Sequence, residues 1–176
     1  MDIAEDLKIW VPVVSFLLSA LAMTFTRRTW FESNRPIVTA EIATHGAGNM
    51  AIAFDLVVRN TGNRPAVAIR LMVCESDLNR ALNIGAPTHL VAEIRRCFSD
   101  RATIPLLHQG KSTRNGFGAT SSLPSANALM INSEIPIRIL YKDLNGRTFK
   151  SKQTLLVKDS TWFAGSGWGK EEEQQS

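Results

Sequence analysis

The sequence is poor in cysteine, because only Cys74 and Cys97 among its 176 residues carry a thiol. So low a number excludes a small secreted scaffold that is held together by several disulfides. The two thiols fit a reducing compartment as free cysteines, but they could also form one disulfide in an oxidising compartment. The cysteines alone therefore do not determine where the protein works, and both are expected to be small buried hydrophobic residues rather than nucleophiles.

The sequence also lacks the spacings that gather metal ligands or catalytic groups. No H-x-x-x-H or C-x-x-C pattern occurs. The three isolated histidines are His45, His89 and His108. Whether a histidine meets Asp55 or Asp100 in space stays open. The segment GKSTRNGFG does not satisfy the phosphate-loop pattern, so residues 110–112 are expected to form a turn. We expect a protein that is not an enzyme and that uses no metal and no cofactor.

Charge is absent from residues 9–25, the run IWVPVVSFLLSALAMTF. Two tryptophans bracket this run twenty residues apart, which corresponds to about 30 Å of helix, the thickness of a bilayer's hydrocarbon core. The sequence therefore predicts one transmembrane helix over residues 9–30, after a short acidic N-terminus at residues 1–8. The residues expected to fix it at the two interfaces are Trp10, Trp30, Arg27 and Arg28.

Two other interpretations of this run stay open. A cleaved signal peptide could use Ala20-Leu21-Ala22 as its processing site, although the preceding residues are acidic on balance rather than basic. A helix buried in a soluble protein would need a polar face, which the few hydroxyl side chains of the run do not supply. If the helix spans a membrane, one stripe of small residues could pack against another helix or face lipid: Ser15, Ser19 and Ala22.

Positive charge near the predicted span sets its expected orientation. Arg27, Arg28 and Arg35 follow the run, whereas Lys8 is the one basic side chain before it. By the positive-inside rule, the N-terminus lies outside and the rest of the chain lies in the cytoplasm. We therefore expect a single-pass protein of the inner (cytoplasmic) membrane, with a linker at residues 31–36.

The segment from Arg27 to Lys158 is basic, with 18 Lys and Arg residues against 9 Asp and Glu residues. Such a segment is attracted to an anionic leaflet, and a nucleic acid or an acidic protein would satisfy the same charge. A solvated surface without a partner is the other interpretation. The densest group of basic residues, and so the candidate contact for a lipid or partner, consists of Arg95, Arg96, Arg101, Lys111 and Arg114.

Alternating hydrophobic residues predict a β-rich domain over residues 37–158. The expected strands are Ile37–Ala43, Ala51–Asn60, Ala66–Glu75, Thr103–Leu107, Gly116–Thr120, Glu134–Lys142 and Arg147–Val157. The alternation places Phe54, Leu56, Ile69, Leu71, Ile137 and Ile139 inward, and Asp55, Arg59, Arg70 and Arg138 outward. Asn145-Gly146 predicts a type I′ hairpin turn.

Helical spacing interrupts the strands between residues 76 and 98. Leu90, Ile94 and Phe98 share one face of a predicted amphipathic helix over Thr88–Phe98, and a further turn of helix is expected within Ser76–Leu82. Residues 159–176 are predicted to form a flexible acidic tail. Its three aromatic residues are candidate partner contacts or, for the first two, candidate core residues: Trp162, Phe163 and Trp168.

The segment FDLVVRNTGNRPAVAIRL resembles bacterial immunoglobulin-like β-sandwiches of the CARDB type, which share a strand, an N-T-G turn and a Pro-Ala step. The segments IPLLHQGKST and IRILYKDLNGRTFKSKQTLLV are similar to further turns of these domains. The anchor followed by Asn34-Arg35-Pro36 resembles uncharacterised bacterial single-pass proteins. The resemblance implies an immunoglobulin-like β-sandwich with a short inserted helix, and it implies no chemistry.

These features predict a membrane-anchored, non-enzymatic binding or assembly module that presents a basic β-sandwich at the cytoplasmic leaflet. Its partners would be the lipid bilayer and another protein or a second copy, and no nucleic-acid motif is present. The alternative is a membrane effector of a bacterial stress or antiphage system, which would sense a ligand or a nucleic acid and cluster its spans.

Overall fold

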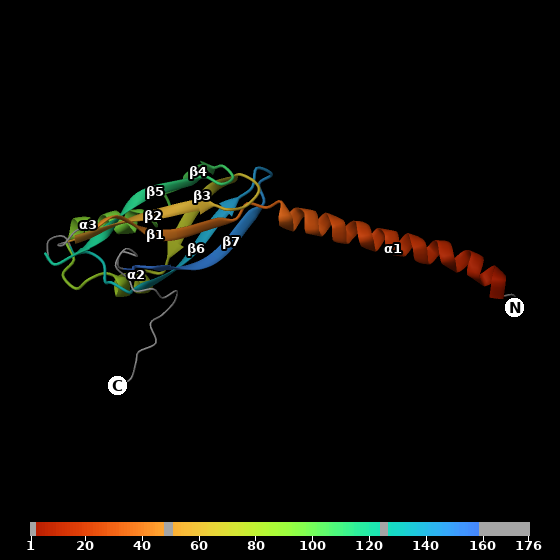
Figure 1. Ribbon diagram of the computed structural model, residues 1–176, viewed down its shortest axis with the longest axis horizontal. Coiled ribbons are helices and arrows are strands. Elements are labelled where there is room, and N and C mark those ends of the chain that lie inside the picture. The colour runs from red at the N-terminus through yellow and green to blue at the C-terminus, as the bar shows by residue number, and fades with distance from the viewer. Residues whose placement is uncertain (1–2, 48–50, 124–126, 159–176) are drawn as a thin grey trace, which may run out of the picture. The chain divides into compact units, whose positions relative to one another are not determined.

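The computed structural model describes residues 3–47, 51–123 and 127–158, and it forms two compact units. The first unit, Met1–Arg35, contains one helix, α1 (Ile3–Ser33). The second unit, Pro36–Ser176, contains all the strands and two short helices (Figure 1). The prediction of an apolar N-terminal helix before a mostly β domain is confirmed.

Helix α1 extends beyond the predicted span at both ends. It begins within the acidic N-terminal segment and continues to Ser33, through the first half of the segment expected as a linker. Asn34 ends the helix, because its backbone N–H and its side-chain amide both donate to the Trp30 carbonyl, at 3.0 and 2.9 Å. Pro36 then prevents further helix, since it has no N–H and restricts Arg35 to extended conformations.

The second unit contains two antiparallel sheets. Sheet A has the order β1-β2-β5, with β1 at Val38–Ala47, β2 at Ala51–Asn60 and β5 at Ser112–Ser121. Sheet B has the order β4-β3-β6-β7, with β4 at Ile104–Leu107, β3 at Ala66–Val73, β6 at Glu134–Lys142 and β7 at Thr148–Leu156. Helices α2 (Glu75–Ala81) and α3 (Thr88–Arg96) lie in sequence between β3 and β4.

The predicted strands all occur, and their bounds differ most where a bulge or helix intervenes. Strands β2 and β6 begin and end as predicted. Strand β1 continues past Ala43 through a β-bulge between Thr44 and Gly46. Strand β3 stops at Val73 because Glu75 already belongs to α2. Strand β5 starts four residues before the predicted Gly116, at Ser112.

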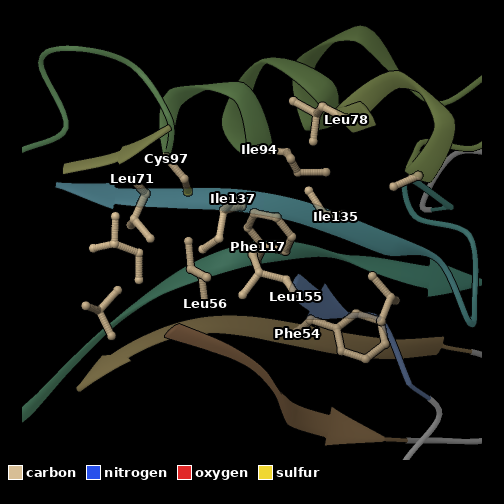
Figure 2. Close-up of a cluster of buried hydrophobic side chains, with 14 of the residues drawn as sticks. Phe54, Leu56, Leu71, Leu78, Ile94, Cys97, Phe117, Ile135, Ile137 and Leu155 are labelled. Atoms are coloured by element: carbon tan, nitrogen blue, oxygen red, sulfur yellow. The ribbon is translucent and has the colours of Figure 1, made fainter. Parts of the chain in front are cut away.

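The core lies within the second unit and follows the predicted alternation. Its buried side chains include Phe54, Leu56, Ile69, Leu71, Ile137 and Ile139, which confirms the register assigned to β2, β3 and β6. Figure 2 shows α2 and α3 above these strands, with Leu78, Ile94 and Cys97 pointing from the helices into the cluster. Burial of these helix faces explains why two short helices interrupt an otherwise all-strand domain.

A bulge in β5 adds a core residue that the alternation did not predict. The register between β2 and β5 shifts between Phe54 and Asp55, which pair with Gly118 and Gly116 respectively. The extra residue on β5, Phe117, is fully buried and packs edge-on against Phe98 at a centroid distance of 5.8 Å. The two glycines of the GFG segment therefore belong to a bulge and not to a phosphate loop.

Gly118 also lets α3 approach the sheet. Its φ is +101°, and a Cβ atom there would lie 3.0 Å from Cδ1 of Ile94. A side chain at this position would strain the backbone and collide with the most buried residue of α3.

Candidate functional site

Helix α1 contains a stretch that is long and apolar enough to cross a membrane. The stretch runs from Trp10 to Ser33, 24 residues with a mean hydropathy of 1.4, and none of it is buried inside the structure. The indoles of Trp10 and Trp30 are 63% and 50% exposed. An exposed surface that is so largely apolar is a candidate contact for a bilayer, a partner or an assembly.

Four hydroxyl groups of this helix donate hydrogen bonds to backbone carbonyls of the helix itself. Ser15, Ser19 and Thr26 each donate to the carbonyl four residues earlier at 2.8 Å, and Thr24 donates to the Leu21 carbonyl at 2.7 Å. Hydroxyls satisfied in this way carry little cost in a hydrocarbon environment. The predicted stripe of Ser15, Ser19 and Ala22 thus needs no second helix for its hydrogen bonds, and its role in packing stays a prediction.

The C-terminal turns of α1 carry the expected basic and aromatic residues. The Arg27 guanidinium lies 5.7 Å from the centre of the Phe31 ring, and Trp30 packs edge-on against the same ring. Arg28 forms an exposed ion pair with Glu32 at 3.2 Å. This end of the helix therefore combines aromatic and charged groups, which is the composition of a membrane–water interface.

The five basic residues predicted as one contact surface take different places in the second unit. Arg95, on α3, pairs with Glu75 of α2 at 2.6 Å and donates to the Asn79 side chain at 2.9 Å. Arg114, on β5, lies 3.8 Å from Asp55. Lys111 precedes β5, and its carbonyl accepts the Asn60 N–H. Arg96 and Arg101 are exposed. No hydrogen bond or ion pair found among the described residues links two of the five.

Asp55 is buried although the alternation places it outward. Its carboxylate is 3.0 Å from Nδ1 of His45 and 3.8 Å from the Arg114 guanidinium, and its side chain is only 11% exposed. His45 is the extra residue of the bulge in β1, and the bulge in β5 lies next to Gly116, which pairs with Asp55. A carboxylate on Nδ1 can orient an imidazole for catalysis, but among the described residues no hydroxyl or thiol hydrogen-bonds His45. The contacts of Asp55 with His45 and Arg114 therefore link side chains from the three strands of sheet A.

The two cysteines are free and differ in environment. Cys74 is exposed, contrary to the prediction of a buried residue, and its hydrogen bond with the Ser76 hydroxyl at 3.2 Å lowers the pKa of its thiol. It lines an open groove of about 590 Å³ together with Asp77, Arg138 and Lys152. Cys97 is buried as predicted, and burial raises the pKa of its thiol. Cys74 is therefore the more reactive of the two.

Asn60 organises the loops at the end of the second unit where β1 begins. Its side-chain oxygen accepts the N–H groups of Ile37 and Gly62 at 3.3 and 3.1 Å. Its amide donates to the carbonyls of Arg64 and Leu107 at 2.7 and 3.0 Å. The side chain is completely buried and connects segments from both sheets. Sequence patterns predicted only a turn here, and the N-T-G step was the signal that a polar side chain organises it.

The hairpin between β6 and β7 lies at the same end. The carboxylate of Asp143 accepts the N–H groups of Asn145 and Arg147, both at 2.9 Å, and Asp143 is itself buried. Gly146 alone adopts a positive φ, of +80°, so the turn is not the predicted type I′, which needs two such residues. Instead, the hairpin has a longer loop that ends in a bulge. Two hydrogen bonds define it: the Gly146 N–H donates to the Asp143 carbonyl, and the Asp143 N–H donates to the Arg147 carbonyl.

The fold and these surfaces define a class of protein: a single apolar helix followed by a two-sheet β domain, with no assembled catalytic centre among the described residues. A family model for a domain of unknown function, DUF8453, matches residues 7–160. The chain therefore belongs to the DUF8453 family. The match includes most of α1 and both sheets, so helix and sheets form one family unit. No curated protein matches the chain.

Sequence patterns missed several residues that the structure places at important positions. Gln153 of β7 accepts from the Ala40 N–H at 2.8 Å and donates to the Val38 carbonyl at 3.3 Å, and so it joins β1 to the opposite sheet. No local pattern marks such a residue, since its partners lie more than one hundred positions earlier. The predicted contacts Trp162, Phe163 and Trp168 lie outside the described residues and also beyond the family match.

Proposed function

We propose that the protein is a single-pass membrane protein whose second unit is a non-enzymatic binding or assembly module in the cytoplasm. The observation that carries this proposal is the wholly exposed apolar stretch of α1, next to a unit whose core is complete without it. A soluble protein would leave this stretch in water at great cost, whereas a bilayer covers it along its full length. Arg27, Arg28 and Arg35 favour the cytoplasmic side for the second unit.

We further propose that the two sheets form an immunoglobulin-like sandwich. In an immunoglobulin constant domain the first, second, fifth and fourth strands form one sheet, and the third, sixth and seventh form the other. The order β1-β2-β5 and β4-β3-β6-β7 differs from this only in the fourth strand, which pairs with β3 instead of β5. Because β4 joins the opposite sheet, no strand among the described residues pairs with the outer edge of β5, where the Ala119 carbonyl near its end accepts the N–H groups of Ala128 and Leu129.

The outer edge of β5 is the surface that we propose for partner binding. The Asn60 N–H donates to the Lys111 carbonyl, and hydrogen-bonded pairs alternate with non-hydrogen-bonded pairs along two antiparallel strands. The N–H groups of Thr113 and Asn115 therefore point to β2. Those of Ser112 and Arg114 point away from the sheet. Residues 112–116 are exposed, and Lys111 and Arg114 flank this edge. An extended acidic segment of a partner protein would add a strand here and match both the backbone pattern and the charge.

The orientation is tested by thiol labelling of the full chain in intact cells, with Cys74 as the natural probe. A membrane-impermeant maleimide should label the protein only after the inner membrane is opened, because Cys74 then lies on the cytoplasmic side. Cys74→Ser should abolish the labelling, since Cys97 is buried. Labelling of Cys74 in intact cells would place the domain outside and contradict the proposal.

The proposed edge is tested by comparing two substitutions at one position. Arg114→Pro removes an N–H that points away from the sheet, whereas Arg114→Ala keeps it and removes the same side chain. A partner that adds a strand to β5 should be captured from solubilised membranes by the wild type and by Arg114→Ala, but not by Arg114→Pro. Equal capture by the two variants would exclude strand addition at this edge.

A further inference from the structure

Three loops meet at the end of the second unit where β1 begins, and together they form what we call the basic end: residues 60–66, 107–112 and 142–148. The four bonds of the Asn60 side chain and the bond from Asn60 N to Lys111 hold the first two loops together. The third follows directly from Lys142, which pairs with Val67 at the start of β3. Figure 1 shows the turn between β6 and β7 at the same end as the start of β1.

The charge of the basic end is of one sign at its surface. Its loops contain four basic residues: Arg64, Lys111, Lys142 and Arg147. The only acidic residue in these loops is Asp143, which is 6% exposed and whose carboxylate accepts two backbone N–H groups of its own turn. The negative charge is thus confined inside the turn, while Lys111 and Lys142 are exposed. A surface of this kind attracts anions.

An apolar residue lies at the tip of the same surface. Leu144 is 68% exposed and follows Lys142 and Asp143 at the turn of the hairpin. Ile37, whose N–H is held by Asn60, is 41% exposed at the start of β1. A soluble anion offers nothing to an exposed leucine, whereas a lipid surface offers acyl chains directly beneath charged headgroups. The combination therefore favours a membrane over a free phosphate or a nucleic acid.

The length of chain between the two units restricts where the basic end can lie. Residues 34–37 join the end of α1 at Ser33 to the start of β1 at Val38. The five Cα–Cα steps from Ser33 to Val38 extend over at most about 18 Å. If α1 spans the bilayer, the basic end is therefore held near the headgroups, and electrostatic attraction to them acts over about 8 Å at physiological salt. Tethering makes this an intramolecular contact, which needs little intrinsic affinity.

We propose that the basic end binds the anionic phospholipid headgroups of the leaflet in which α1 is anchored, through Lys111 and Lys142 together with Arg64 and Arg147, while Leu144 enters the interface. This inference rests on the proposed membrane span and adds a lipid ligand to it. The five residues that the sequence suggested do not form this surface, apart from Lys111.

The test uses the full chain in lipid nanodiscs, with an environment-sensitive fluorophore on a single cysteine. The labelled protein is Leu144→Cys in a Cys74→Ser background, and discs are made with phosphatidylcholine alone or with added phosphatidylglycerol. The emission should shift to shorter wavelengths only in the anionic discs, and added salt should reverse the shift. The same fluorophore at Ile84→Cys, a position that is fully exposed in a loop outside the basic end, should show no shift.

Two charge reversals make the test specific. Lys111→Glu with Lys142→Glu should abolish the shift, whereas Arg95→Glu with Arg96→Glu on α3 should leave it unchanged. Circular dichroism of each variant checks that the fold is retained. A shift that survives the first pair, or that is lost only with the second, would overturn the proposed surface.

The controls separate this inference from the membrane span and from other ligands. If the chain elutes with the discs but shows no shift in anionic lipid, the basic end does not bind headgroups although α1 is inserted. If the chain does not enter the discs at all, the span itself is wrong, and with it this inference. A shift in phosphatidylcholine discs on adding glycerol phosphate or an oligonucleotide would identify a soluble ligand and contradict the lipid assignment.

Discussion

Asn60 shows how a single polar residue can determine the geometry of several loops. Its side chain makes four hydrogen bonds to backbone groups in three segments, and it is fully buried. A buried amide is costly unless each donor and acceptor has a partner, and here each has one. The arrangement of the basic end, including the position of Lys111, therefore depends on this residue.

Asn60→Ala should destabilise the protein by about 2–4 kcal/mol, because it leaves several buried backbone groups without partners. The free energy of unfolding of the solubilised chain, measured with urea, tests this expectation. Asn145→Ala is the matched control, since Asn145 is exposed and contributes only its backbone N–H to the turn. A loss no larger than that of the control would mean that water satisfies these groups as well as Asn60 does.

Cys97 gives the folded state a measurable dependence on alkaline pH. Burial raises the pKa of this thiol and is the largest effect on it. The hydrogen bond from Asn115 and the positive charge of Arg96 lower the pKa, but they do not outweigh burial. The folded protein therefore keeps Cys97 protonated at a pH where the unfolded chain ionises it. The corresponding stability is complete below the unfolded pKa, near 9.0, and is lost as the pH rises through the folded pKa.

The difference in unfolding free energy between wild type and Cys97→Ala should therefore shrink as the pH is raised above about 9. Unfolding in urea at pH 7.5 and at increasing alkaline pH measures it, and other titrating groups cancel in the difference. The difference in unfolding free energy between wild type and Cys74→Ser should not shrink in this way, because Cys74 is exposed and the pKa of its thiol is lowered rather than raised. A constant difference for Cys97→Ala would show that its thiol does not ionise differently on unfolding.

At the scale of the elements, periodicity predicted the strands and failed where the chain departs from it. The inward positions of β2, β3 and β6 were predicted because each strand alternates regularly over most of its length. The burial of Phe117 and of Asp55 was not predicted. A bulge moves one residue out of the alternation, and no local sequence pattern indicates where the bulge occurs. Likewise, Ala68 adopts a positive φ of 51° at the irregularity in β3, which its sequence does not indicate.

The candidate surfaces were less predictable than the strands for a related reason. The sequence grouped five basic residues because they lie close in sequence, whereas the structure separates them onto α3, the following loops and β5. The basic end unites residues from three distant loops, so only the strand order could assemble it. The apolar stretch of α1 needed no such information, because a continuous run of mostly apolar residues without charge is visible directly in the sequence.

The contact between α3 and β5 depends on a glycine, and this gives a prediction at the same scale. Gly118→Ala should cost about 2–4 kcal/mol, because alanine disfavours a φ of +101° and its Cβ would press on Ile94. Gly46→Ala is the matched control, since nothing lies within 4 Å of the added Cβ and its φ is not positive. Thermal unfolding of both variants tests this, and equal melting temperatures would contradict the close approach of α3.

At the scale of the whole molecule, the two units have different physical requirements. The second unit buries a core that consists only of its own residues. Helix α1 contains a predominantly apolar stretch of 24 residues and buries none of it inside the structure, which a membrane or an equivalent cover would remove from water. The family match over residues 7–160 indicates that the two are retained together. Location at a membrane is therefore the central part of the proposed function.

The most direct test of this claim is extraction of cell membranes with alkaline carbonate, followed by detection of the full chain in the pellet and the supernatant. We predict that the protein stays in the pellet and is released only by detergent, because an apolar helix that spans the bilayer cannot leave it when peripheral contacts are broken. Replacing Leu17 and Leu18 with lysine should move the chain to the supernatant, since two charges at the centre of the span oppose insertion. Full release of the wild-type chain by carbonate alone, as a soluble protein, would contradict the account.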